Sequence, residues 1–244
     1  MKYRETLYAN YHTTQSGRAA LTDAKSLFER EKWRFEKEIL PLINLPKSAR
    51  ILDIGCGSGS FLKALSEHGY TEITGIDLSE EQVKLAHQLG VTQVQQGDLV
   101  EFLNAAEHKF DLISGMDIIE HFTKNELVDL LHLIQNYLNP GGIAIFRTPN
   151  LDAPMATVYA NGDFTHENYM NASSAQQVMM ACGFEKVQVF ESNMQIPNAL
   201  KEIIRKVVFS ILKFRFKLTL FATGRSTQNV LISPNMVIIA KNHG

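Results

Sequence analysis

Residues 51–62 read ILDIGCGSGSFL, and the interpretation of the whole chain begins from this stretch. A strand-like run leads into three glycines at alternate positions, and a helical pattern follows them. Gly55, Gly57 and Gly59 permit positive φ and let a ligand approach the main chain closely. Asp53 precedes them, and its carboxylate would repel the pyrophosphate that a GxGxxG dinucleotide loop binds. The compressed GxGxG spacing with a carboxylate beside it therefore favours a ligand that carries an ammonium or a sulfonium group.

Strands alternate with helices along most of the chain. Short apolar or β-branched runs bounded by Gly, Asp or Pro predict strands at 50–54, 72–77, 91–95, 110–114, 142–147, 186–192 and 235–241. Ser79, Thr123 and Ser173 are each followed three residues later by Gln or Glu, which is the capping-box pattern of a helix start. This alternation indicates an α/β domain with a parallel sheet and helices on both faces.

The glycine loop, DIGCGSG in this chain, resembles the first motif of class I S-adenosylmethionine-dependent methyltransferases. The segments GIDLS, QGDL, FDLISGMDIIEHF and LNPGGIAIFRTPN resemble the family's later motifs in the same order. The resemblance implies that Asp77 accepts the ribose hydroxyls, Asp98 accepts the adenine amine and Arg34 pairs with the cofactor's carboxylate. The alternatives are a helix cap, a turn residue and a solvated helix-face charge, respectively. The cofactor-binding residues implied in this way are Arg34, Asp53, Gly55, Cys56, Gly57, Gly59, Asp77, Leu78, Asp98, Leu99 and Met116.

The resemblance also implies the architecture of the sheet. It covers roughly residues 30–192 and the last strand, and it implies one domain over residues 1–244. The expected fold is a Rossmann-like seven-stranded sheet, with six parallel strands, an antiparallel last strand and helices on both faces. Insertions at 149–172 and 193–234 are expected to project over the acceptor side as a lid.

The N-terminal segment 1–48 is expected to form a helical cap. A helix is predicted over 21–43, with Trp33 and Phe35 as its packing anchors. The first residues, MKYRETLYANYHTT, contain no apolar core of a signal peptide, so no secretory leader is expected.

The composition is that of an ordinary globular domain, with 45% hydrophobic and 20% charged residues among 244. Cys56 and Cys182 lie outside any CxxC or CxxH pattern, so neither a thiolate zinc site nor a disulfide framework is expected. The sequence contains no run of 18 apolar residues, so no membrane-spanning helix is expected. The sequence therefore predicts a cytoplasmic protein.

Two histidines are expected at the edge of the sheet where the strands end. His121 follows the fourth predicted strand, and His166 follows the fifth. A histidine can remove the proton of a hydroxyl acceptor at neutral pH, so His121 is predicted as the catalytic base and His166 as the second candidate. In an alternative, Asp117, Glu120 and His121 share one helical face and hold a divalent metal, as has been implicated in the similar O-methyltransferases of ubiquinone biosynthesis. No metal is favoured.

The acceptor is predicted from a weaker resemblance. TPN, DFTHENY and SSAQQVMMACGF, followed by a basic and apolar insertion, look like methyltransferases of bacterial surface-polysaccharide and O-antigen clusters. That resemblance implies O-methylation of a sugar hydroxyl in polysaccharide biosynthesis. Alternatives are a quinone precursor or another small phenol as acceptor and, outside catalysis, a cofactor-binding accessory subunit at a membrane.

The insertion also carries an uneven charge. Residues 201–225 hold seven Lys or Arg and one Glu, a local charge of +6, so the rest of a chain of net charge −2 carries −8. Apolar positions at helical spacing over 199–221 are compatible with a helix packed on the domain or with one resting on an anionic membrane, at the inner membrane face. Nucleic acid is not expected as a partner, because the remainder is acidic. The sequence leaves the oligomeric state open.

Overall fold

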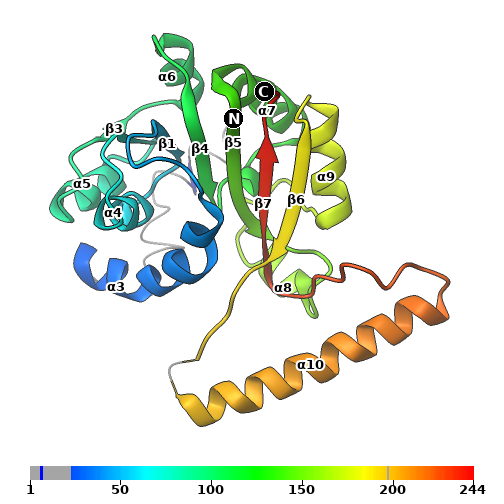
Figure 1. The fold of residues 1–244 in the computed structure, drawn as a ribbon. Helices are drawn as coiled ribbons and strands as arrows, with labels where there is room; N and C mark the ends of the chain where they lie inside the picture. Colours follow the sequence, from blue (N-terminus) through cyan, green and yellow to red (C-terminus); the bar gives the residue numbers. More distant parts are fainter. Residues whose placement is uncertain (1–5, 8–22, 197) are drawn as a thin grey trace.

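The structure, a computed structural model, describes residues 6–7, 23–196 and 198–244 (Figure 1). Its seven strands form one sheet in the order β3-β2-β1-β4-β5-β7-β6. Their bounds are β1 Ile51–Ile54, β2 Ile73–Asp77, β3 Val94–Gln96, β4 Phe110–Met116, β5 Leu138–Pro149, β6 Lys186–Glu191 and β7 Asn235–Lys241. β7 pairs antiparallel with β5 and β6, and every other pairing is parallel. The predicted Rossmann-like sheet with an antiparallel last strand is confirmed.

Helices cover both faces of the sheet. The α-helices of the described structure are α3 Ala24–Arg34, α4 Ser60–Glu67, α5 Glu80–Gln88, α6 Leu99–Ala105, α7 Lys124–Tyr137, α8 Ala156–Ala160, α9 Ala172–Ala181 and α10 Ala199–Ala222, and α10 does not lie on the sheet. One apolar core lies between the sheet and α6, α7 and α9, and the other lies beneath α3, α4 and α5. β7 supplies both cores, since Ile238 packs in the first and Val237 in the second, as the two-residue period of a strand requires.

The order of the strands reverses between β1 and β4. The chain first builds outward from β1 through β2 to β3, and it then returns to the other side of β1 with β4. In open α/β sheets, ligands bind beyond the carboxyl ends of the strands at such a reversal. The fold therefore directs attention to the loops that follow β1 and β4.

β1 and β2 begin within one residue of their predicted starts, and two other strands begin further from theirs. β3 begins three residues late, because the residues before it belong to the turn that ends α5. Gly90 there has φ +86°, and the amide of Val91 donates to the carbonyl of Ala86 at 2.9 Å, which is the Schellman arrangement. β5 begins at Leu138 and not at residue 142, since Leu138 pairs with Phe110 before the register shifts.

The N-terminal helix is shorter than predicted. After Arg34 it continues as a π-helical turn, η2 Phe35–Ile39, and a 3₁₀ turn, η3 Leu40–Leu42, and Pro41 lacks the amide hydrogen that a longer α-helix would use. Phe35 is buried as predicted, but Trp33 is only partly buried, and Phe28 is the second buried aromatic. Of the predicted cap, residues 1–5 and 8–22 lie outside the described part of the chain.

The predicted helix caps have mixed outcomes. Thr123 forms the complete capping box with Glu126 at the start of α7. At α5, the Ser79 hydroxyl accepts the amide of Gln82. The predicted cap at Ser173 is wrong, because the side chain of Asn171, two residues earlier, accepts the Ser174 amide and begins α9.

The helix α10 is set apart from the sheet and joined to β6 and β7 by extended segments (Figure 1). None of its residues is buried within the described structure, so the helix does not enter the apolar core, and its inner face meets the domain through the ion pair of Lys213 and Glu191. The two ends of the insertion 193–234 nevertheless stay together, since the Ser192 amide donates to the Ser233 hydroxyl at 3.1 Å. Among the residues described, no helix is both long and apolar enough to cross a membrane.

Candidate active site

The glycine loop joins β1 to α4 with three residues in the left-handed region. Gly55, Gly57 and Gly59 have φ values of +60°, +53° and +73°. A Cβ on Gly55 would lie 2.2 Å from the side chain of Ile118, so this glycine also permits close packing against the β4 loop. A Cβ on Gly57 would meet nothing closer than 3.8 Å, which leaves open space in front of the loop. The loop can therefore receive a ligand against its main chain.

Cys56 holds the loop against β2. Its amide donates to the carbonyl of Ile76 at 3.1 Å, and its side chain packs so closely over Gly75 that a Cβ there would come within 2.7 Å of the sulfur. Burial raises the pKa of the Cys56 thiol well above its usual value. Cys56 thus positions the loop, and its thiol is not reactive.

Asp77, at the end of β2, fixes the far side of the loop. Its two carboxylate oxygens accept the amides of Gly57 and Ser79, each at 2.8 Å. Asp77 is not the cap of α5, because Ser79 is. A carboxylate has about four lone-pair positions, so two remain to accept hydroxyl donors from a ligand.

Asp53 is buried at the end of β1, beneath the glycine loop. The hydroxyl of Ser114, its neighbour in the β1–β4 pairing, donates to it at 2.7 Å. Burial raises the pKa of the Asp53 carboxyl to about 7, and the nearby Asp77 contributes to the shift. The sequence prediction missed Ser114, whose only signal is its register opposite Asp53.

Asp98 follows β3 and caps the next helix. Its carboxylate accepts the amides of Val100 and Glu101 at 2.8 and 3.1 Å, so it is a helix cap and not merely a turn residue. The amide of Gly97 donates to the Asp77 carbonyl at 3.0 Å, which joins the ends of β2 and β3. Leu78 and Leu99 follow these strands, Leu78 exposed and Leu99 partly buried, and Met116 ends β4.

The side chain of Arg34, at the end of α3, is not the solvent-exposed charge on a helix face that the alternative interpretation describes. Its guanidinium lies over the ring of Phe35 and 3.5 Å from Glu31, and its Nε is buried without a hydrogen-bond partner in the described structure. Burial and the proximity of Arg147 lower the pKa of Arg34. The guanidinium of Arg147 pairs with Asp117, so the buried Nε of Arg34 is a donor left to meet an anion.

Arg147, near the end of β5, connects the N-terminal cap to the loop after β4. It pairs with the carboxylate of Asp117, and its Nε lies 3.6 Å from Glu38 on η2. Asp117 has φ +55°, so the backbone is not helical there. The predicted helical face of Asp117, Glu120 and His121 is therefore wrong, because Asp117 binds Arg147. Sequence reasoning also missed Arg147 and Glu38, which no local pattern marks.

His121 and His166 lie at one edge as predicted, although they are 45 positions apart in the sequence. His121 ends the 3₁₀ turn η4 Ile119–His121, and its ring centroid is 4.9 Å from that of His166 in an edge-to-face arrangement. Backbone hydrogen bonds bring the two histidines together. The carbonyl of Glu120 accepts the amides of Glu167 and Asn168 at 2.8 and 3.0 Å, which ties the later loop to the earlier turn.

A buried hydrogen-bond chain orients the ring of His121. The Thr165 hydroxyl donates to the Asp163 carboxylate at 2.6 Å, so it must accept the Nδ1 hydrogen of His121 at 2.9 Å. Nε2 of the neutral ring is then the unprotonated nitrogen. Burial and the neighbouring His166 lower the pKa of His121, which keeps the ring neutral at pH 7.

His166 has the same tautomer for a different reason. Its Nδ1 lies 2.8 Å from the carbonyl of Ala160, which can only accept, so Nδ1 carries the hydrogen. Asp163 and Thr165 were not predicted. Their signal was the Asp-x-Thr spacing of an Asx turn, in which the Asp163 carboxylate accepts the Thr165 amide at 2.8 Å.

Glu120 lies beside the two histidines. Its carboxyl is buried, it accepts the Thr148 hydroxyl at 3.0 Å, and burial raises its pKa to about 8. One ligand atom each from Glu120, His121 and His166 lies within 4.8 Å of the others. Imidazole nitrogens and a carboxylate suit a divalent cation, so the donor set fits a metal, whereas Asp117 does not belong to it.

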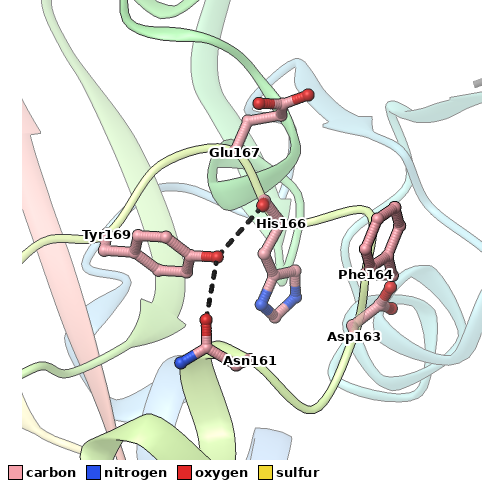
Figure 2. A pocket seen from close by; sticks show the side chains of 6 residues that line it. All are labelled: Asn161, Asp163, Phe164, His166, Glu167 and Tyr169. Atoms are coloured by element: carbon pink, nitrogen blue, oxygen red, sulfur yellow. Dashed lines mark hydrogen bonds between the residues drawn. The ribbon is translucent and has the colours of Figure 1, made fainter. Parts of the chain in front are cut away.

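A pocket of about 540 Å³ opens at His166, whose ring adjoins that of His121 (Figure 2). It is lined by Asn161, Asp163, Phe164, His166, Glu167 and Tyr169. The Tyr169 hydroxyl, with one hydrogen to donate, lies 3.2 Å from the carbonyl of His166 and 3.4 Å from the side-chain oxygen of Asn161, which supports one wall. The Phe164 side chain is 83% exposed. An exposed aromatic ring beside a basic imidazole can receive a flat or weakly polar acceptor.

Comparison with known proteins agrees with this arrangement. Residues 27–189 match the family described as methyltransferase domain, which is more than half of the chain. A SAM-dependent methyltransferase from Archaeoglobus fulgidus superposes with a TM-score of 0.65 at 24% identity, covering 88% of this chain and 94% of that one. The resemblance inferred from the motifs is thereby confirmed.

Two curated relatives match a shorter region. The ubiquinone biosynthesis O-methyltransferase of Coxiella burnetii is 33% identical over 113 residues, which are 43% of this chain and 45% of the relative. The Bacillus subtilis methyltransferase YqeM is 36% identical over 110 residues, or 42% and 43%. The matched region thus spans less than half the length of these curated relatives.

Proposed function

Because the chain belongs to the methyltransferase-domain family and has the class I S-adenosylmethionine-dependent fold, we propose that it methylates a hydroxyl group with His121 as base. The observation that carries this proposal is the hydrogen-bond chain from Asp163 through Thr165 to His121. It fixes the tautomer that leaves Nε2 able to take a proton, and the adjoining His166, with its ring centroid 4.9 Å away, lines a pocket open to an acceptor.

The donor site suits S-adenosylmethionine. Asp77 has lone pairs for the ribose hydroxyls, and the open space at Gly57 lets a ligand lie against the loop. Asp53 supplies a buried carboxylate for the amino acid's ammonium, and Arg34 supplies a positive charge for its carboxylate. We assign the adenine amine to Asp98, with Leu78, Leu99 and Met116 flanking the ligand.

The chemistry that remains for the protein is alignment and proton removal. S-adenosylmethionine supplies a methyl group that is already activated on a positively charged sulfur. The acceptor oxygen forms a bond to this methyl carbon as the carbon–sulfur bond breaks, and the hydroxyl proton passes to His121 Nε2. Asp163, through Thr165, stabilises the imidazolium that results, and His166 lies close enough to bind the acceptor.

The acceptor that we propose is a small phenol, such as a quinone precursor. Two features support it: the aromatic lining from Phe164 and Tyr169, and the curated relative named for O-methylation in ubiquinone biosynthesis. Polysaccharide biosynthesis, the first expectation from the sequence, has no support from the relatives, so a sugar hydroxyl is the competing outcome of the test. A phenol also ionises more readily than a sugar hydroxyl, which suits one imidazole base.

The test is a matched acceptor panel. The purified chain is first titrated with S-adenosylmethionine and with its demethylated product in a calorimeter, and binding of both is expected. Methyl transfer is then measured with catechols and hydroxylated quinone precursors against nucleotide sugars. Turnover of the phenols alone supports the proposal, and turnover of the sugars alone contradicts the acceptor class. Tight donor binding with no turnover of either class would favour an accessory subunit.

A chelator arm tests the metal alternative at Glu120, His121 and His166. We propose that these residues work without a metal, so the rate should survive excess chelator. Complete loss of the rate, with recovery on adding Mg²⁺ or Mn²⁺, would instead support a metal-assisted reaction.

A further inference from the structure

The outward face of α10 is its most apolar face. Residues at three- and four-residue spacing form this outer apolar stripe, and each is between 54% and 74% exposed: Leu200, Ile203, Ile204, Val207, Ile211, Phe214, Leu218 and Phe221. Less exposed residues, among them Glu202, Phe209, Lys213 and Phe216, alternate with them on the opposite side. A solvated helix would present the reverse arrangement, so the outer apolar stripe requires an occupant.

The charges around the outer apolar stripe are all positive. On a helical projection Lys206 and Lys217 flank one edge, and Lys201 and Arg215 flank the other. The one acidic residue of the helix, Glu202, faces inward, where it pairs with Arg205 at 2.7 Å and lies 3.7 Å from the ammonium of Lys206. The flanks therefore present four cations, and one of them, Lys206, has an acidic partner on the inner face.

We infer that the outer apolar stripe of α10 docks on an anionic lipid bilayer, with the helix lying in the plane of the headgroups. At about 1.5 Å per residue, its 24 residues make a contact roughly 36 Å long. Apolar side chains enter the acyl boundary while flanking lysines and arginines meet lipid phosphates, as in interfacial helices. A second copy of this chain fits less well, since pairing two such stripes would bring like charges together at both edges.

The fold gives this contact an orientation. The insertion that carries α10 leaves the sheet at the carboxyl end of β6 and returns at the start of β7, the edge where His121 and His166 lie. Lys213 pairs with Glu191 at 2.7 Å, which links the inner face of the helix to the end of β6. The docked helix would thus hold that edge near the bilayer, and on the proposed function this favours an acceptor that resides in the membrane.

The test is flotation of the full chain with vesicles, without donor or acceptor, so that its result is independent of the proposed function. Vesicles contain phosphatidylcholine alone or with a third phosphatidylglycerol. Binding is expected only to the anionic vesicles. Lys206→Glu with Lys217→Glu should weaken it by about thirtyfold or more, because each basic residue near a surface contributes roughly fivefold. Ile204→Ser with Ile211→Ser should also weaken it.

The matched control reverses two exposed lysines elsewhere, Lys124→Glu with Lys186→Glu, and should bind as the parent does. Circular dichroism and donor affinity check that all variants fold. Equal binding to both vesicle types, or equal weakening by the control, overturns the inference. So does a chain that ignores vesicles and elutes as a dimer that Ile204→Ser with Ile211→Ser makes monomeric, since the outer apolar stripe would then bind a second copy.

Discussion

The glycine loop at Gly55–Gly59 and the pair His121–His166 lie at the same edge of the sheet but are held by different means. The loop is fixed by the neighbouring strand, β2. Its backbone amides donate to the carboxylate of Asp77 and to the carbonyl of Ile76. The histidine pair is fixed by a contact between segments that are distant in the sequence. The carbonyl of Glu120 accepts backbone amides of the loop that carries His166. The half that we propose for the donor is thus built by local strand–loop geometry, whereas the half that we propose for the acceptor depends on tertiary contacts.

The largest expected effect separates the two halves. His121→Ala should lower kcat by about 10²–10⁴-fold, the usual contribution of a positioned base, while donor affinity stays within about twofold. Initial rates on a responsive phenol and calorimetry with the donor measure the two quantities. His132→Ala, an exposed histidine of α7, is the matched control and should keep the parent rate. A full rate in His121→Ala would remove the base from the proposal.

A second variant tests how the acceptor half is oriented. Thr165→Val removes the hydroxyl that joins Asp163 to His121 and should lower kcat about ten- to hundredfold, as loss of a histidine's supporting partner does elsewhere. Thr165→Ser keeps the hydroxyl and should recover most of the rate. Similar losses in both variants would mean that Thr165 matters only for packing, which melting temperatures would show independently.

The donor half should respond to pH through Asp53. Its carboxyl is half protonated near pH 7 in the free protein, since burial raises its pKa to about 7, and a bound ammonium favours the ionised form. Donor binding should therefore tighten as pH rises, by about tenfold from pH 6 to pH 8. Asp53→Asn should bind weakly with a flat profile. A parent profile equally flat over this range would exclude Asp53 as the ammonium partner.

The smallest effect concerns Asp98, whose structural and ligand roles can be separated. Serine caps helices about as well as aspartate, so Asp98→Ser should change the free energy of unfolding by less than about 0.5 kcal/mol. Its shorter side chain cannot reach as far, so donor affinity should fall about threefold to tenfold, the value of one hydrogen bond. Unchanged affinity in this variant would leave Asp98 as a helix cap alone.

The same contrast explains what the sequence could predict. The strands, the glycine loop, Asp53 and Asp77 carry short-range signals: alternation, left-handed glycines and strand-end carboxylates. Asp163 and Thr165 lack such a signal for their role, because their partner His121 is supplied by another loop. Arg147 and Glu38 were missed for the same reason, as only the folded sheet brings β5 against the N-terminal cap.

The predicted starts of β3 and α9 are wrong, because neighbouring elements compete there for the same residues. Val91 suits a strand by its side chain, yet its amide closes the end of α5. Asn171 precedes the predicted cap at Ser173 and takes its place. A backbone hydrogen bond decides the first case, and a side-chain cap that stands two residues earlier decides the second.

The hydrogen bond between Ser192 and Ser233 has a consequence for how this protein could diversify. With the two ends of the insertion side by side, β6 and β7 form a hairpin whose tip carries α10. Hairpin tips tolerate gain, loss and replacement of segments, because the paired strands do not depend on what joins them. If α10 docks on a membrane as inferred, the membrane contact and the catalytic edge can change separately, and a relative can gain or lose the contact by exchanging one helix.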